Sequence, residues 1–180
     1  TGLMIICTGK FTKRLHEFVG QEKEYTGTIV LGGTTPSYDL ETEVDQTFST
    51  EHITDEDIYA FAKAYQGNIM QRPPVFSALK KEGKRLYEFA RAGEEVDIPK
   101  REINISSFEI TRIAMPEVDF KVRCSKGTYI RSLAFDFGEG LKSGAHLSAL
   151  RRTKIGDYNV DDAQSLDGFI AEITAGSTEE

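Results

Sequence analysis

The sequence predicts an α+β fold in which a mostly antiparallel sheet is flanked by helices. Residues 120–124 alternate apolar and polar side chains, which is typical of a strand with one buried face. The period then changes, and apolar residues recur at helical spacing: Ile130, Leu133, Ala134, Phe137 and Leu141. Residues 103–113 and 118–124 flank a Met-Pro-Glu turn, which is typical of an antiparallel pair. Strands and helices mixed in this way indicate the α+β class.

Length and composition are those of one globular domain. The chain has 180 residues, of which 39% are hydrophobic and 28% charged. No apolar run approaches the roughly 20 residues of a membrane span. The net charge of −7 argues against a protein that coats nucleic acid without sequence preference, because such proteins are usually basic. Bases nevertheless gather at residues 80–85 and 151–154, so a local basic groove is compatible with the acidic whole.

The first half of the chain predicts four elements. Residues 3–7 form an apolar run that we expect to be a buried strand, and residues 11–19 have helical spacing. Residues 24–31 predict a strand with Tyr25 on its apolar side, followed by a polar loop. A helix over residues 55–66 follows, with Thr54 as its N-cap and three acids in its first turn.

The second half begins with an extended stretch and ends in a helix. Paired prolines exclude a central strand at residues 73–74, and a helix is expected over residues 86–92. Residues 145–150 predict a short apolar element, and residues 155–160 an edge strand. Ser165 caps a last helix, whose inward face we expect to be Leu166, Phe169, Ile170 and Ile173. Residues 174–180 are predicted to be a disordered polar tail.

The junction between strand 120–124 and the helix that follows is a candidate site. Arg131 falls in the first turn of this helix, where free N–H groups make a cation unfavourable. A residue that breaks a local rule often marks a site, although an ordinary ion pair with a nearby carboxylate would also explain Arg131.

The sequence contains no motif for a metal or a cofactor, which favours chemistry without either. The three histidines have no metal-ligand spacing, the two cysteines read as reduced core thiols, and no dinucleotide-binding or nucleophile-elbow motif occurs. Tyr25 is either a core tyrosine or a site residue. Four basic residues could meet phosphates or be solvated charges: Lys80, Lys84, Arg151 and Arg152. Aromatic faces surrounded by basic groups suit an unstacked nucleotide.

Several long motifs are similar to those of the TruB family of tRNA pseudouridine synthases, which modify the T-arm uridine. They are QRPPVFSALK (71–80) with YEFARAG (87–93), KGTYIRSL (126–133), GAHL (144–147) and LRR (150–152). The likeness runs from Thr1 to about Ile173 in the family's order. It implies a pseudouridine synthase fold over residues 1–173, in a short form without the PUA domain that many members carry.

The resemblance also implies roles. Tyr25 would stack on a flipped uracil and take part in proton abstraction, and Arg131 would pair with the catalytic aspartate. Tyr129 and Leu150 would line the pocket, and Lys80, Lys84, Arg151 and Arg152 would contact RNA. The substrate would be the uridine at position 55 in the T arm of tRNA. No metal, cofactor, membrane or obligatory protein partner is implied, and we expect a cytoplasmic monomer.

One departure from the family pattern bears on mechanism. The family's nucleophilic aspartate lies in a Gly-Thr-Leu-Asp-Pro-like loop just upstream of the residue that matches Thr1, and these 180 residues contain no such loop. We therefore expect an N-terminally incomplete catalytic domain that is inactive alone. Loop 32–39 also lacks an acid near its second threonine. The alternatives are a non-catalytic RNA-binding or tRNA-folding module and, less in keeping with the motifs, a small-molecule enzyme.

Overall fold

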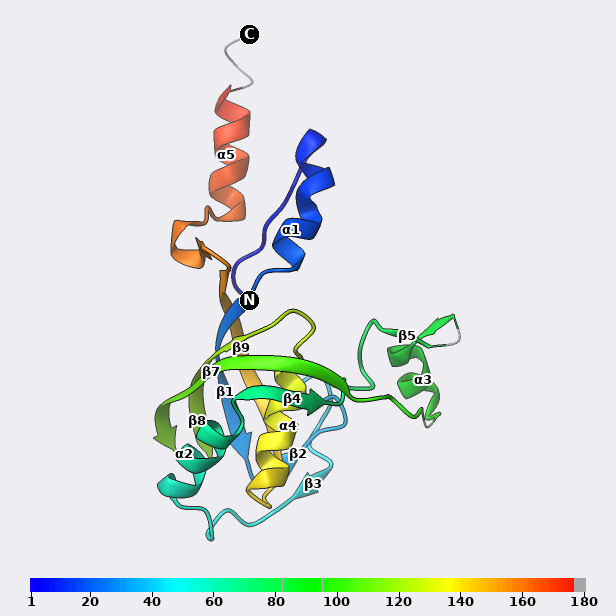
Figure 1. Cartoon of the computed structure of the whole chain (residues 1–180), viewed down its shortest axis with the longest axis vertical. Coiled ribbons are helices and arrows are strands. Elements are labelled where there is room, and N and C mark those ends of the chain that lie inside the picture. Colours follow the sequence, from blue (N-terminus) through cyan, green and yellow to red (C-terminus); the bar gives the residue numbers. More distant parts are fainter. Residues whose placement is uncertain (82, 95, 177–180) are drawn as a thin grey trace.

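The computed structural model describes residues 1–81, 83–94 and 96–176, and it confirms the α+β class. Its centre is a six-stranded sheet in which every neighbouring pair is antiparallel. The strand order, shown in Figure 1, is β10 (Tyr158–Asn159), β9 (Ala145–Ile155), β1 (Lys23–Leu31), β8 (Glu117–Cys124), β7 (Arg101–Ala114) and β4 (Gly67–Gln71).

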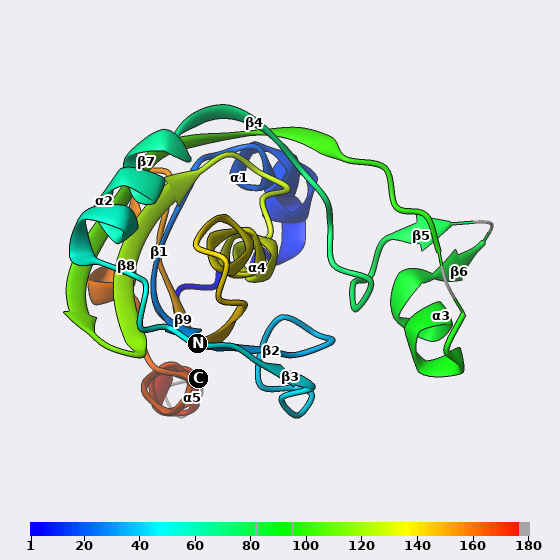
Figure 2. The same ribbon diagram turned by 90° about the horizontal axis from the view of Figure 1, so that it is seen from below.

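Helix α4 (Ile130–Gly140) lies against the concave face of this curved sheet, as Figure 2 shows. Its apolar stripe is buried as the helical spacing predicts, with Leu133, Ala134 and Phe137 fully enclosed. The ring of Phe137 meets Phe108 of β7 edge-on at 6.0 Å between centroids. Burial of these side chains holds the middle of α4 against the sheet.

Helix α2 (Asp55–Ala64) confirms its predicted start. The Thr54 hydroxyl accepts the Asp57 N–H, and the Asp57 carboxylate accepts the Thr54 N–H, which completes a capping box. Ile58 and Ala62 are buried in the core, and the Phe61 ring contacts Phe137 of α4 edge-on. The helix therefore closes one side of the core around α4.

Two small units extend from the main sheet. Strands β2 (Gly33–Thr34) and β3 (Gln46–Thr47) pair with each other beside β9. Strands β5 (Lys80–Lys81) and β6 (Lys84–Arg85) form a hairpin that leads into α3 (Leu86–Ala92), the helix predicted there. Figures 1 and 2 show this second unit projecting to one side of the sheet.

The predicted strand at residues 3–7 is wrong. Leu3 is buried, but Met4 is 71% exposed and Ile6 76% exposed. Gly2 forms an isolated parallel bridge with Arg152 of β9, and the Leu3 N–H donates to the Arg152 carbonyl at 2.8 Å. An apolar run cannot by itself specify a pairing partner, and beyond Leu3 this run has none among the described residues. The helix predicted after it begins as a 3₁₀ turn, η1 (Gly9–Arg14), and continues as α1 (Leu15–Val19).

The C-terminal elements also differ from expectation. The short elements expected at 145–150 and 155–160 are one long strand, β9, with a two-residue edge strand, β10, followed by η2 (Val160–Asp162). The last helix, α5 (Leu166–Gly176), starts after Ser165 as predicted, but its supposedly inward residues are all exposed: Leu166, Phe169, Ile170 and Ile173. Residues 174–176 of the expected tail are helical, and 177–180 lie outside the described residues.

Candidate active site

The start of α4 is held by a buried glutamine. Gln71, at the end of β4, is 2% exposed. Its side-chain amide donates to the Tyr129 carbonyl at 3.1 Å and accepts the Tyr129 N–H at 2.8 Å. Tyr129 is the N-cap of α4 and has no capping hydrogen bond from its own side chain. Gln71 therefore satisfies backbone groups of the N-cap and fixes where Arg131 emerges.

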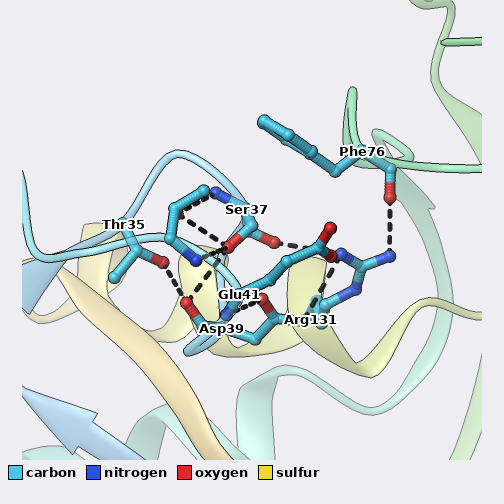
Figure 3. Close-up of polar contacts among 7 residues, drawn as sticks. Thr35, Ser37, Asp39, Glu41, Phe76 and Arg131 are labelled. Carbon is cyan, nitrogen blue, oxygen red and sulfur yellow. Dashed lines mark hydrogen bonds and ion pairs between the residues drawn. The ribbon is translucent and has the colours of Figure 1, made fainter. Parts of the chain in front are cut away.

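Arg131 reaches two segments that are far apart in the sequence. Its Nη2 donates to the Phe76 carbonyl at 2.7 Å, and its Nη1 donates to the Ser37 carbonyl at 3.2 Å. Nη1 also lies 3.4 Å from Oδ2 of Asp39, and the two side chains are 21% and 26% exposed. Figure 3 shows these groups converging on the guanidinium. The carboxylate offsets the unfavourable position of a cation in the first helical turn.

Asp39 is held in place by its own loop. Its carbonyl accepts hydrogen bonds from the hydroxyls of Thr35 and Ser37, at 2.7 and 3.1 Å. Its Oδ1 accepts the Glu41 N–H at 3.0 Å (Figure 3). Neighbouring Tyr38 has a φ of 66° and stacks on Phe135 of α4 at 4.3 Å. The loop thus presents Asp39 to Arg131 in a fixed geometry.

Sequence reasoning missed Asp39 as a site residue. In the sequence, loop 32–39 stands out only because it lacks an acid near its second threonine, where the family pattern has one. The usable signal was an aspartate among small hydroxylated residues, which commonly order a loop through side-chain to backbone bonds. The left-handed backbone at Tyr38, which directs the next residue toward α4, has no signature in the sequence.

A cavity of about 410 Å³ opens beside Arg131. Its walls are mostly aromatic or small side chains, with one cation and one anion: Phe76, Ser77, Ala78, Tyr87, Tyr129, Arg131 and Glu41. The volume falls in the range of small-ligand pockets, and the mixture of apolar walls with few polar groups is typical of them. The structure therefore brings together Tyr129 and Arg131, two of the predicted site residues.

Tyr25 lies in a second cavity, of about 320 Å³. It shares that cavity with Arg152, its cross-strand partner on β9, and with residues 125–128 of the connection into α4. Burial raises the pKa of Tyr25, and the Arg152 guanidinium opposes part of the rise. Tyr129 and Arg131 line the other cavity, so the 125–131 segment borders both, and Tyr25 and Arg131 do not share one pocket.

The other predicted residues are spread over two places. Leu150 and Arg151 line a shallow hollow of about 370 Å³ with Thr26 and Thr28 of β1. Lys80 and Lys84 are exposed on the β5–β6 hairpin, and the Lys84 ammonium lies 5.6 Å from the centre of the Phe89 ring. The hairpin thus presents two lysines, of which Lys84 lies next to an aromatic face.

The described residues contain no group of three or more His, Cys, Asp or Glu side chains that could hold a metal ion. Both cysteines are free thiols, but only Cys124 is a core residue: Cys7 is half-buried, in the run that forms no strand. Burial raises the pKa of Cys124 to about 11. Within the described ranges, no helix combines the length and the apolar character that crossing a membrane requires.

Comparison with known proteins identifies the family. The model of the TruB family pseudouridylate synthase N-terminal domain matches residues 1–130, and that of the tRNA pseudouridylate synthase B C-terminal domain matches residues 131–179. The chain belongs to the TruB family. The boundary between the two matches falls between Ile130 and Arg131, at the start of α4.

Relatives and solved structures agree with this TruB assignment. The chain is 64% identical to tRNA pseudouridine synthase B of Flavobacterium johnsoniae over 169 residues, covering 94% of this chain and 74% of that protein. It is 52% identical to the protein of the same name from Phocaeicola vulgatus, covering 94% and 72%. A solved Cbf5–Nop10–Gar1 complex contains a similar chain, with 27% identity, a TM-score of 0.64, and coverage of 88% of this chain and 37% of that one.

Proposed function

We propose that this TruB-family protein is a tRNA pseudouridine synthase, an isomerase that converts the T-arm uridine at position 55 to pseudouridine. The observation that carries the proposal is the Arg131 cavity. It has aromatic walls and a guanidinium fixed by its ion pair with Asp39, in a chain 64% identical to a tRNA pseudouridine synthase B. A pocket of this kind accepts a base that has left the helical stack.

The reaction exchanges one bond to the ribose for another. The N1–C1′ glycosidic bond breaks, the uracil turns, and C5 bonds to C1′. The proton on C5 leaves and N1 gains one, so the product is an isomer of the substrate. A carboxylate nucleophile and a proton acceptor suffice for this chemistry.

Arg131 is proposed to keep a carboxylate ionised at the reacting centre. A guanidinium beside a carboxylate favours the charged form, and a partly enclosed site strengthens that effect. Tyr129 is proposed to form a wall for the base, and Leu150 to contact the same nucleotide. Tyr25 is proposed to stack on the uracil and to accept its proton. Tyr25 and Arg131 line separate cavities, and the segment 125–131 contributes residues to both.

The nucleophile is proposed to be an aspartate other than Asp39. Asp39 does not stand in the family's sequence context for the nucleophile, and its carboxylate accepts the Glu41 N–H and pairs with Arg131, so the role proposed for it is to orient the guanidinium. These 180 residues contain no aspartate in the family's Gly-Thr-Leu-Asp-Pro-like context. We accordingly propose that the 180-residue chain alone binds tRNA without isomerising it.

RNA binding is proposed to use the basic groups outside the cavities. Lys80 and Lys84 stand on the projecting hairpin, and Arg151 is exposed on β9. Arg152 completes the proposed set, and its Nε donates to the Leu3 carbonyl at 2.8 Å. Phosphate contacts of this kind set the position of an RNA and make its affinity depend on salt. We propose that the protein acts as a cytoplasmic monomer.

The test is a tritium-release assay. The full-length gene product and the 180-residue chain are each incubated with unmodified tRNA that carries tritium at C5 of its uridines. We expect the full-length gene product to release one tritium per tRNA and the 180-residue chain to bind without release. Salt-dependent binding without release by the full-length gene product would instead establish a non-catalytic RNA-binding module. Release by the 180-residue chain, with its mass confirmed, would overturn the assignment of the nucleophile.

A further inference from the structure

Ser77 carries a buried hydroxyl without a partner. The residue is 5% exposed, and among the described residues its Oγ has no hydrogen-bond partner. A hydroxyl removed from water without a replacement bond costs about 1–3 kcal/mol. Native structures contain few such groups, and each calls for an explanation.

The other buried serines differ from Ser77 in this respect. The hydroxyl of Ser132 donates to the Arg72 carbonyl at 2.7 Å, and that of Ser143 donates to the Gly144 carbonyl at 3.0 Å. The Ser37 hydroxyl bonds to both the Asp39 carbonyl and the Thr42 hydroxyl. The fold therefore satisfies the serines that it encloses for structural reasons, and Ser77 is the exception among these four.

The backbone around Ser77 is well fixed. Its N–H donates to the Val75 carbonyl at 2.9 Å, and its carbonyl accepts the Tyr87 N–H at 3.2 Å. The preceding residue, Phe76, provides the carbonyl that accepts Arg131 Nη2. The position of Ser77 is thus tied to that of the guanidinium, and the missing bond does not come from a loose segment.

Ser77 lines the same cavity as Arg131 and Tyr129. We propose that the Ser77 hydroxyl is a substrate-contacting group, which forms a hydrogen bond with a polar atom of the nucleotide that enters this cavity. The inference rests on the proposed function, since it takes the ligand to be a nucleotide of the substrate RNA. This hydrogen bond is then formed only in the complex with RNA, and binding removes the free-energy cost of the unpaired hydroxyl.

Substitution distinguishes this role from a structural one. Ser77→Ala removes a hydroxyl that has no partner among the described residues, so we expect an unchanged or higher Tm. The same change removes a contact with substrate, so we expect kcat/KM for tRNA to fall about tenfold in the full-length gene product. Ser143→Ala is the matched control, because it removes a satisfied hydroxyl away from the cavity and should lower Tm with kcat/KM retained.

Two outcomes would overturn the inference. A kcat/KM within twofold of wild type in Ser77→Ala shows that the hydroxyl makes no substrate contact. A Tm lowered as much as in Ser143→Ala, or failure of the variant to fold, shows that the hydroxyl is satisfied in the free protein, for example by a bound water. Failure of the proposed function is recognised separately, because wild type itself would then release no tritium from tRNA.

Discussion

Arg131 and Asp39 form an ion pair that joins the first turn of α4 to loop 35–42, with Nη1 and Oδ2 3.4 Å apart. The pair explains how a cation persists at the positive end of a helix. It also brings into one place two residues 92 positions apart, of which only Arg131 stands out in the sequence.

Asp39→Asn tests the ion pair. The change leaves the half-enclosed guanidinium without its anion, so we expect the free energy of unfolding to fall by about 1–2 kcal/mol and tRNA turnover to fall at least tenfold. Urea unfolding and tritium release measure the two effects. The control is Asp45→Asn, at an exposed acid just after this loop that accepts the Thr34 hydroxyl. Equal effects of the two substitutions would contradict a special role for Asp39.

Gln71→Leu tests how α4 is held. The variant leaves the N–H and the carbonyl of Tyr129 without their buried partner, and we expect a loss of about 2–4 kcal/mol in urea unfolding. Gln164→Leu, at an exposed residue bonded to Glu172, should change stability by less than about 0.5 kcal/mol. A Gln71→Leu variant as stable as wild type would show that solvent replaces the glutamine.

Arg151 and Arg152 are adjacent but face different surroundings, and we expect their substitutions to differ. Arg151 is exposed, so Arg151→Gln should weaken tRNA binding and make the slope of log affinity against log salt concentration shallower by about one. Turnover of bound tRNA should stay unchanged. Arg152 bonds to Leu3 and lines the cavity of Tyr25, so Arg152→Gln should also lower kcat. Filter binding at several salt concentrations and single-turnover assays separate the effects. Identical profiles would show that both residues only bind phosphate.

Tyr65 and Asp136 predict a pH dependence of stability. Burial raises the pKa of Asp136, and the hydrogen bond from the Tyr65 hydroxyl opposes part of the rise; Lys100 also lowers the pKa and Glu139 raises it. The folded state therefore holds this proton more tightly than the unfolded state. The protonated Asp136 carboxyl therefore adds to the free energy of unfolding. This contribution is complete below the pKa of the group in the unfolded state and is lost as the pH rises through its pKa in the folded state.

We expect Asp136→Asn to gain stability relative to wild type as the pH rises from 4 to 8, because the amide has no charge to desolvate. Tyr65→Phe should have the opposite effect, since it removes a bond that favours the carboxylate. Urea unfolding at several pH values measures both. Curves that run parallel to wild type over this range would contradict the raised pKa.

The sequence was informative wherever a pattern reflects local backbone geometry. The helical spacing from Ile130 to Phe137, the Thr54 cap and the strands around Pro116 are all confirmed. It was uninformative where the outcome depends on a partner elsewhere in the fold. The apolar residues Met4 and Ile6 predicted a strand, yet they are exposed, because hydrophobicity alone does not specify what covers a segment.

The candidate site shows the same limit. Arg131 could be found because it breaks a local rule, but its partner Asp39 and the unpaired hydroxyl of Ser77 depend on contacts between distant segments. Likewise, the family resemblance groups Tyr25 with Arg131, and the lining of the two cavities by residues of segment 125–131 could not be read from the sequence. Tertiary packing, which no local pattern encodes, decides each of these relationships.

Turnover by Arg131→Ala in the full-length gene product tests most directly that the Arg131 cavity is the active site. The substitution removes the bonds to Ser37 and Phe76 and the ion pair with Asp39, while the buried face of α4 stays intact. We predict a cooperative thermal unfolding transition, retained tRNA binding, and tritium release at least 1,000-fold slower than wild type, about 4 kcal/mol of transition-state stabilisation. Release within tenfold of the wild-type rate by the folded variant would contradict the assignment.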